Sequence, residues 1–301
     1  MIPSLLVWLG AVLAAPLLPD LRSRMRAQQH ARHGPPWGTT WAMILRHLRL
    51  TTPRDAASTP VSTRASHLAW VCLVLALALL PGTGVVGLGF EGDLILFIYL
   101  LLLSRLAELV AVVDGADWTT RLAAEREARV LLGTETTLAL LLGGLAAISQ
   151  STQLDGIFST SPRGPHLLPL ALVLLSMLGL VVASSGASPS DEPSPVSELL
   201  GNRRPLLASR SGPELATLLW ASSLRLLISA GLFGATLRLL IPGRLVIIQL
   251  IGVLLAVVVL GVLDSRAPRQ TPPRALGLVL SSALLGLVAA SILLLRHPGA
   301  S

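Results

Sequence analysis

Several ionisable residues lie inside stretches that are otherwise strongly apolar, where a charge is costly. Arg105 and Glu108 are three positions apart in DLILFIYLLLLSRLAEL, so a helix would place them on one face, where they can pair. Arg225 has no acid within a helical turn and needs a partner from another helix. Charged side chains in such segments usually turn inward, are paired and mark functional sites, so these residues are candidates for chemistry.

Glu127 and Glu135 form a second pair of candidates, eight residues apart in AEREARVLLGTETTLALLLGG. On a helix this spacing corresponds to about 12 Å of rise and, at about 100° per residue, to directions about 80° apart, so both residues lie on one side of the helix. Glu127 alone is explained as a first-turn acid favoured by the helix dipole. Burial of a carboxyl group favours its neutral form, which can exchange a proton. Two interpretations of Glu135 stay open: it belongs to a proton relay with Glu127, or it is simply paired with Arg225 or Arg105.

The composition excludes a water-soluble domain. Only 13% of the 301 residues are charged, 52% are hydrophobic and the mean hydropathy is +0.73. The single Cys72 rules out a disulfide framework within the chain. All 23 basic residues are arginine, which we attribute to coding bias and to basic loops beside a membrane, not to nucleic-acid binding. With no paired histidines in an apolar segment and no glycine-rich phosphate loop, we expect no cofactor or metal ligands in this chain.

The elements that must position these residues are apolar runs of membrane-spanning length. The predicted fold class is an all-α integral membrane protein, a single transmembrane domain over residues 1–301 with eight transmembrane helices. The N-terminal run lacks a positive region before it, so we interpret it as a first transmembrane helix and not as a signal peptide. The predicted helices are 2–18, 67–90, 93–113, 129–148, 166–185, 214–241, 245–264 and 275–295.

The arginines alternate from loop to loop in a way that supports this count. Seventeen lie in or at the border of loops 19–66, 114–128, 186–213 and 265–274, and three lie in the loops of the opposite side. The positive-inside rule makes the four arginine-rich loops cytoplasmic and places both termini outside. Two of these loops are long, and function is expected there.

The first loop contains an amphipathic segment, TTWAMILRHLRL, from Thr39 to Leu50. Helical periodicity places Trp41, Ile44, Leu45 and Leu48 on one face, which suits a helix lying along the membrane surface. Two interpretations remain: a plain interfacial anchor, or a helix that forms the wall of a cavity opening at the membrane surface.

An ordered set of segments is similar to a known family. The segments are RMRAQQHARHGPPWGTTWAMILRHLRL, DLILFIYLLLLSRL, AEREARVLLGTE, PSDEPSPVSEL, RPLLASRSG and VLDSRAPRQ. In order and spacing they resemble the membrane subunit shared by respiratory complex I, an NADH–quinone oxidoreductase, and the energy-converting, membrane-bound nickel–iron hydrogenases, including the formate hydrogenlyase type. The resemblance covers nearly the whole chain, and the third predicted helix is similar to that of the hydrogenase branch.

The resemblance implies a subunit that anchors a peripheral electron-transfer module to the membrane and couples it to proton translocation. It implies hydrogenase- or quinone-module subunits and antiporter-like subunits as partners, and a bacterial inner membrane as the location. Fe–S clusters and a nickel–iron centre or quinone would belong to partner subunits. The alternative is a stand-alone transporter or membrane scaffold without a redox partner, although a transporter often shows matching helix breaks in its two halves and only the PGTG break at 81–84 is visible.

Site roles follow from the resemblance residue by residue. The proton relay would consist of Glu127, Glu135, Asp191 and Glu198. The charge partners would be Arg105, Glu108, Arg126 and Arg225. The residues near the peripheral subunits would be Arg32, Arg46, Asp114 and Arg269.

The chain departs from the family pattern mainly in loop 186–213. Neutral residues stand where the family has other side chains, most of them acids, at Met43, Ser184, Ala187, Ser190, Ser194 and Val196, and Asp264 replaces a glutamate. Three prolines would also interrupt a helix in this loop. A continuous relay through the loop is therefore in doubt, and a flexible Ser/Pro-rich segment is the other interpretation.

Overall fold

The computed structural model describes residues 2–50, 60–81, 93–114, 118–159, 167–184, 212–240, 245–266 and 272–295. Within these ranges every named element is a helix, and strand-like pairing is limited to a bridge between Asp93 and Gln153. The helices are α1 (Ile2–Ala14), α2 (Leu17–Gln29), α3 (Thr39–Arg49), α4 (Pro60–Leu79), α5 (Leu94–Val113), α6 (Trp118–Ser149), α7 (Leu154–Ser159), α8 (Leu167–Ser184), α11 (Gly212–Leu240), α12 (Leu245–Arg266) and α13 (Pro272–Leu295).

The all-helical membrane class is confirmed. Among the described residues, five helices are long and apolar enough to cross a membrane, in α4, α5, α6, α11 and α12, and α1 with α2 forms a sixth candidate bent by 43°. The described apolar parts of α8 and α13 are shorter, covering Leu168–Ser184 and Val279–Ala289. Each of the eight predicted segments thus overlaps a helix, although residues 82–90 of the second lie outside the described residues. The count of eight spans stays a prediction.

Three predicted segments have wrong boundaries. The helix predicted at 67–90 is α4, which begins at Pro60 and ends at Leu79. The segment 2–18 is not one straight span, because the helix breaks at Ala15 and Pro16 and continues as α2. The helix α6 already begins at Trp118, so most of the predicted loop 114–128 is helical. Glu127 therefore lies well inside α6, and its interpretation as a first-turn acid is wrong.

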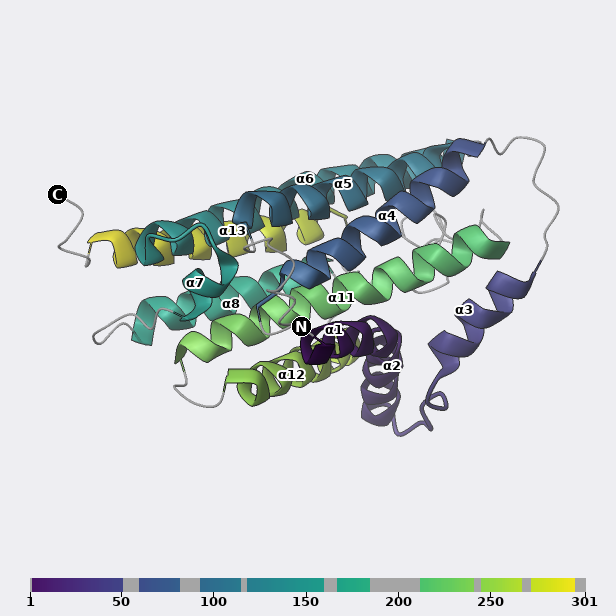
Figure 1. Ribbon diagram of the computed structural model, residues 1–301, viewed down its shortest axis with the longest axis horizontal. Helices are drawn as coiled ribbons and strands as arrows, with labels where there is room; N and C mark the ends of the chain where they lie inside the picture. The colour runs from purple at the N-terminus through teal and green to yellow at the C-terminus, as the bar shows by residue number, and fades with distance from the viewer. Residues whose placement is uncertain are drawn as a thin grey trace.

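The long helix α11 lies in the middle of the bundle and packs against α12, α4, α8 and α3 (Figure 1). The pairs α4–α5, α5–α6, α6–α13 and α8–α13 complete the packing. Close approach of α11 and α12 depends on glycine: a Cβ atom added at Gly252 would lie 2.5 Å from the Cα atom of Gly234. The core of the bundle therefore surrounds α11, which carries Arg225.

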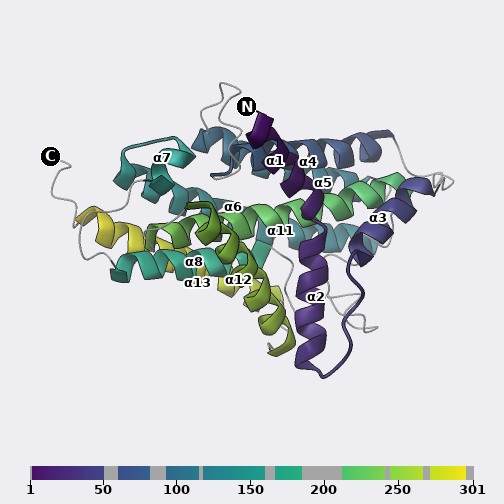
Figure 2. The same ribbon diagram turned by 60° about the horizontal axis from the view of Figure 1, so that its bottom comes forward.

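The first three helices form one flank of the bundle. Figure 2 shows α2 leaving the bundle beside α12, whereas α1 and α3 lie against the other helices. The segment predicted to be an amphipathic helix is helical, as α3. Ile44 is buried and Trp41 is half-buried, but Leu45 and Leu48 are exposed. The predicted apolar face is therefore divided between contact with the protein and an exposed surface, and its location at the membrane surface stays a prediction.

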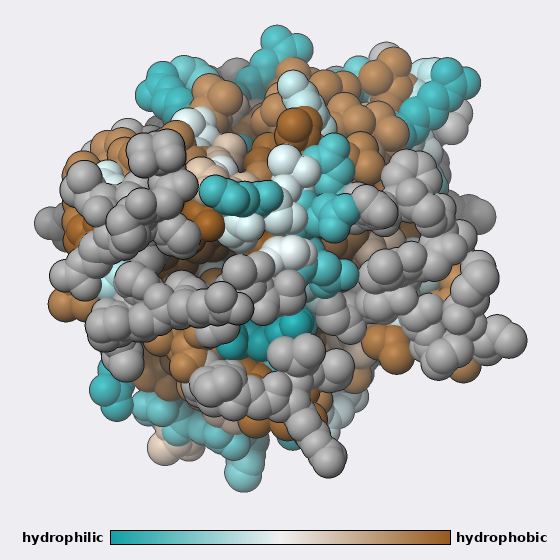
Figure 3. Space-filling model, turned by 60° about the vertical axis from the view of Figure 1, so that its left-hand side comes forward, coloured by the Kyte–Doolittle hydropathy of each residue, from teal (hydrophilic) through white to brown (hydrophobic). Residues whose placement is uncertain are grey.

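Large apolar side chains are exposed on the outer faces of the helices, including Leu5, Leu68, Leu103, Ile251 and Leu284. Seen from the end at which the C-terminus lies, brown hydrophobic surface lies to both sides of a group of hydrophilic and neutral residues (Figure 3). This distribution suits helices that face lipid with their outer sides.

Candidate functional site

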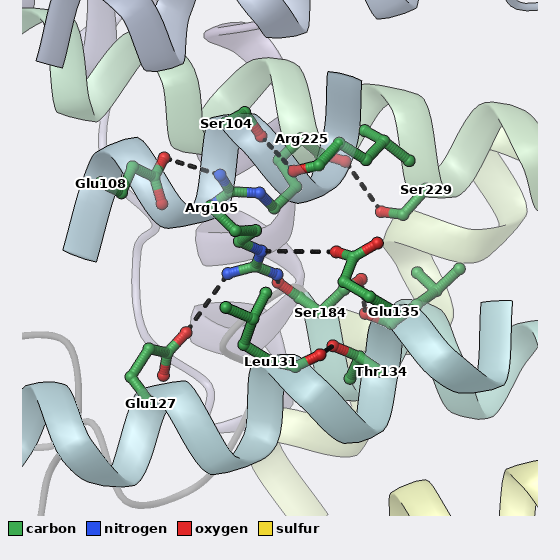
Figure 4. A network of polar contacts seen from close by, with 12 residues as sticks. Ser104, Arg105, Glu108, Glu127, Leu131, Thr134, Glu135, Ser184, Arg225 and Ser229 are labelled. Atoms are coloured by element: carbon green, nitrogen blue, oxygen red, sulfur yellow. Dashed lines mark hydrogen bonds and ion pairs between the residues drawn. The ribbon is translucent and has the colours of Figure 1, made fainter. Parts of the chain in front are cut away.

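The guanidinium group of Arg105 lies between two glutamates of the neighbouring helix (Figure 4). Its Nη1 atom donates to Glu127 Oε1 at 3.2 Å, and its Nε atom is 3.9 Å from Glu135 Oε1. Its Nη2 atom donates to the backbone carbonyl of Ser184 in the last turn of α8, where the helix dipole favours a cation. The side chain of Arg105 is only 6% exposed, so these contacts replace its hydration.

The placement of Glu127 and Glu135 on one face of α6 is confirmed, because both reach the same arginine. The spacing of eight residues produces this arrangement, and α5 supplies the cation from the adjacent helix. Arg105 is one of the two arginines that the sequence analysis considered as ion-pair partners of Glu135.

The sequence allows an ion pair between Arg105 and Glu108. In the structure each of them has an ion-pair partner on another helix, so a pair between the two is not needed to neutralise either group. Glu108 forms an ion pair with Arg225 of α11, with Oε1 and Nη2 2.7 Å apart. The requirement that Arg225 find a partner on another helix is thereby met. Because Arg225 is 7% exposed and Glu108 18%, the pair is largely shielded from solvent.

Glu135 has the least complete set of contacts of these glutamates. Its ion-pair distance of 3.9 Å is the longest of the three carboxylate distances in the cluster. Its other oxygen, Oε2, is buried and has no hydrogen-bond partner within the described part of the chain. A charged carboxylate with a buried oxygen that lacks a hydrogen-bond donor costs free energy, and binding of a proton to this oxygen removes that cost.

Glu135 also borders a small cavity of about 50 Å³ between α5, α6, α8 and α11. Its polar lining comes from Thr134, Glu135, Ser184, Arg225 and Ser229, and the remaining lining side chains are apolar. A cavity of this size has room for a few water molecules, at roughly 10–15 Å³ each on this measure. Glu135 and Arg225 therefore border the same cavity, and water molecules in it could exchange a proton with Glu135.

Counted over the ion pairs of the described side chains, the charges of the cluster do not balance if every member is ionised. The ion pairs join the two cations Arg105 and Arg225 to the three carboxylates Glu108, Glu127 and Glu135. One proton on the three glutamates would make the group neutral, and neutral groups are much cheaper to hold in an apolar interior. The arrangement can hold one exchangeable proton.

The other predicted site residues lie apart from this cluster or cannot be placed. Arg32 and Arg46 are exposed on the segment that includes α2 and α3, and Asp114 is half-buried at the C-terminal end of α5. The backbone of Arg126 belongs to α6, but its side chain lies outside the described residues, as do Asp191, Glu198 and Arg269. Their predicted roles stay predictions.

Sequence reasoning missed polar contacts between distant helices, among them two that involve a carboxylate. Glu214 accepts hydrogen bonds from Ser62 at 2.8 Å and Thr63 at 2.5 Å, joining α11 to α4. Asp264 forms an ion pair with Arg22 at 2.5 Å, joining α12 to α2. No local sequence signal identifies these partners, because they are about 150 and 240 positions apart.

Among the residues that the structure describes, no group of three or more His, Cys, Asp or Glu side chains is arranged to hold a metal ion. The cluster contains no cysteine, and the free Cys72 lies in α4. The donor set consists of guanidinium and carboxylate groups, which is suited to charge and proton exchange and not to redox-cofactor ligation.

Comparisons with known proteins agree with one another. Residues 2–295 match the family model of NADH dehydrogenase. The chain is 30% identical over 229 residues to hydrogenase-4 component C of Escherichia coli (strain K12), covering 74% of this chain and 71% of that protein. A chain of the membrane-bound sulfane sulfur reductase, an archaeal respiratory membrane complex, superimposes with a TM-score of 0.78 at 18% identity, covering 96% of this chain and 98% of that one. The last similarity concerns the fold.

Proposed function

The chain belongs to the NADH dehydrogenase family, and we propose that it anchors a peripheral electron-transfer module to the membrane and couples this module to proton translocation. It is a multi-pass membrane subunit of an energy-converting complex. The comparisons lend no support to a stand-alone transporter or scaffold. Fe–S clusters, and a nickel–iron centre or quinone, would be held by partner subunits.

The observation that carries this proposal is the position of Arg105 between Glu127 and Glu135, with a cavity beside Glu135. When Glu135 holds a proton, Arg105 keeps its ion pair with Glu127. When Glu135 loses the proton, both carboxylates compete for the same guanidinium group. A shift between α5 and α6 that changes the 3.9 Å distance would therefore change the proton affinity of Glu135.

The link to the peripheral module is proposed to run through the exposed basic segment that contains Arg32 and Arg46. Asp114, Arg269 and the side chain of Arg126 would contribute on the same side, and Asp191 and Glu198 would extend the acidic path. This side is proposed to be cytoplasmic, with both termini outside a bacterial inner membrane, because the arginine-rich loops lie there. Antiporter-like subunits would receive the coupled charge movement.

The assembly part of the proposal is tested by purifying the tagged chain in mild detergent and identifying its partners by mass. We expect a hydrogenase- or quinone-module subunit together with antiporter-like subunits. Recovery of the chain alone, or only with copies of itself, would refute a role in such an assembly.

The coupling part is tested with Glu135→Gln in the complete complex, reconstituted in vesicles that report proton uptake. The matched control is Glu125→Gln on the same helix, because Glu125 forms an exposed pair with Arg129 at 2.5 Å. We expect Glu135→Gln to lower the number of protons moved per electron while redox turnover and assembly persist, and the control to leave the ratio unchanged. An unchanged ratio in Glu135→Gln would contradict a relay role.

A further inference from the structure

The break between α1 and α2 leaves backbone carbonyl groups without the usual helical donors. Pro16 has no N–H group, so it cannot donate to the carbonyl of Val12 four positions earlier. The last turn of a helix leaves its carbonyls outside the i→i−4 pattern, and Leu13 belongs to that turn of α1. Inside a membrane-spanning segment such groups must find other donors.

Two tryptophans from other helices supply these donors. The indole N–H of Trp220 in α11 donates to the carbonyl of Val12 at 3.2 Å. The indole N–H of Trp41 in α3 donates to the carbonyl of Leu13 at 3.0 Å. Two consecutive carbonyls of the break are thus capped by side chains from α11 and α3.

The same indole rings also contact one another. The ring centroids of Trp41 and Trp220 are 5.2 Å apart with an interplanar angle of 64°, an edge-to-face arrangement. Trp70 of α4 also contacts Trp220, with its ring centroid 5.2 Å from that of Trp220. The break, α3, α4 and α11 therefore meet at Trp220.

Trp220 precedes Arg225 by five residues on α11, which is about 7.5 Å along a rigid helix. The intervening Ala221, Ser223 and Leu224 are buried, so this part of α11 is held on several sides. An axial shift or rotation of α11 at Trp220 would consequently be carried to the Arg225–Glu108 ion pair.

We propose that Trp41 and Trp220 are positioning residues that cap the α1–α2 break and transmit the position of α3 to Arg225. The inference rests on the proposed function, since α3 carries the exposed Arg46 that would face the peripheral module. Displacement of α3 by a docked partner would move Trp41, and the ring contact with Trp220 would pass the movement to α11 and to the cluster.

The test uses the full chain in its complex, in lipid nanodiscs, with hydrogen–deuterium exchange of α1 and of the α11 segment around Trp220. Trp220→Phe keeps an aromatic ring and removes the indole N–H. Because the loss of one hydrogen bond of this kind changes exchange by roughly 2- to 12-fold, faster exchange of about that size is expected in both segments.

The decisive comparison is the double variant Pro16→Ala with Trp220→Phe. The backbone at Pro16 is already helical, with φ −66° and ψ −10°, so alanine there can supply the N–H group that Val12 lacks. We expect Trp220→Phe to have less than a twofold effect on exchange in the Pro16→Ala background. Trp8→Phe is the control, since Trp8 donates to Val74 in α4 and its effect should be the same in both backgrounds.

An equal effect of Trp220→Phe in both backgrounds would overturn the capping role. If Pro16→Ala does not assemble, an isosteric benzothienyl side chain at position 220 provides the second variant, because it retains the ring shape without the N–H group. It should reproduce the exchange increase of Trp220→Phe, and wild-type exchange in this variant would overturn the proposal.

The coupling readout separates this inference from the proposed function. We expect Trp220→Phe to lower the protons moved per electron at unchanged redox turnover, and Pro16→Ala to restore the ratio. A wild-type ratio in Trp220→Phe would overturn the transmission to Arg225. Absence of proton coupling in the wild-type complex would overturn the proposed function, while the exchange results would still decide the capping role.

Discussion

Replacing Arg105 by methionine should destabilise the protein more than removal of any single glutamate of the cluster. Methionine is unbranched, uncharged and shorter than arginine, so the substitution keeps the aliphatic part of the side chain and removes the guanidinium group. It removes the shared partner of Glu127 and Glu135 and the donor to the Ser184 carbonyl.

The magnitude follows from the contact distances and exposures. A unit charge pair at 3.9 Å, the distance between Arg105 and Glu135, attracts with about 4 kcal/mol at an effective dielectric constant near 20. Removal of one partner of a buried pair typically costs about 3–5 kcal/mol, since a buried charge is left behind. The two glutamates retain 15% and 14% exposure and can bind protons, so we expect the lower end, about 3 kcal/mol.

The assay is the free energy of unfolding in mixed micelles, followed by tryptophan fluorescence. Arg129→Met is the control, because its pair with Glu125 is 70% and 58% exposed and should contribute only about 0.3–0.5 kcal/mol. Adding Glu127→Gln and Glu135→Gln to Arg105→Met should recover about half of the loss or more, because no unpaired buried charge then remains.

Equal stability losses for Arg105→Met and Arg129→Met would refute the reasoning, as would a failure of the two glutamine substitutions to recover stability. The first result would mean that the buried ion pairs contribute no more than a surface pair. The second would mean that Arg105 acts through packing and not through charge.

Three further predictions concern the helices that position the cluster. Asp20→Ala removes three hydrogen bonds at the start of α3, donated by two backbone N–H groups and one hydroxyl group, and should lower the free energy of unfolding by about 1–2 kcal/mol. Amide exchange at the start of α3 should become faster, and unchanged exchange would show that α3 needs no cap. Gly252→Ala should lower the free energy of unfolding by about 1–3 kcal/mol, because the added Cβ would lie 2.5 Å from the Cα atom of Gly234. Gly143→Ala, where the added Cβ has no atom within 4 Å, should be neutral or stabilising, and similar effects at both positions would contradict the close packing of α11 and α12. Asp264→Asn weakens the ion pair with Arg22 and should increase amide exchange of α2 but not of α13. Equal changes in both helices would show that this ion pair does not stabilise α2 in particular.

Local patterns in the sequence are enough to predict the class of protein and most helices. Runs of apolar residues with the length of a bilayer crossing do not depend on distant contacts, so the positions of α5, α8, α11, α12 and α13 are close to the predicted ones. The helix α4 is displaced, because it begins at Pro60 in a polar stretch and ends at Leu79, before the glycine-rich PGTG sequence that the prediction included. The eight-residue spacing of Glu127 and Glu135 likewise determines a shared face, because the helical repeat alone decides it.

Helix boundaries are predicted less well where a polar stretch is helical or where an apolar stretch contains a helix break. The segment from Trp118 to Ala128 is polar and was assigned to a loop, yet it continues α6. Hydropathy detects the part of a helix that suits lipid, whereas the helix itself ends only where its backbone hydrogen bonds do. The break at Pro16 was missed for the opposite reason, because apolar residues continue across it.

Only the tertiary structure decided the partners of the charges. Glu108 is adjacent to Arg105 on its own helix, but it forms an ion pair with Arg225, more than 100 positions away, because α5 and α11 bring these side chains together. The Trp220 bond to Val12 spans 208 positions for the same reason. The sequence thus determines which groups are too costly to leave alone in an apolar helix, and the packing of the helices determines which partner each of them finds.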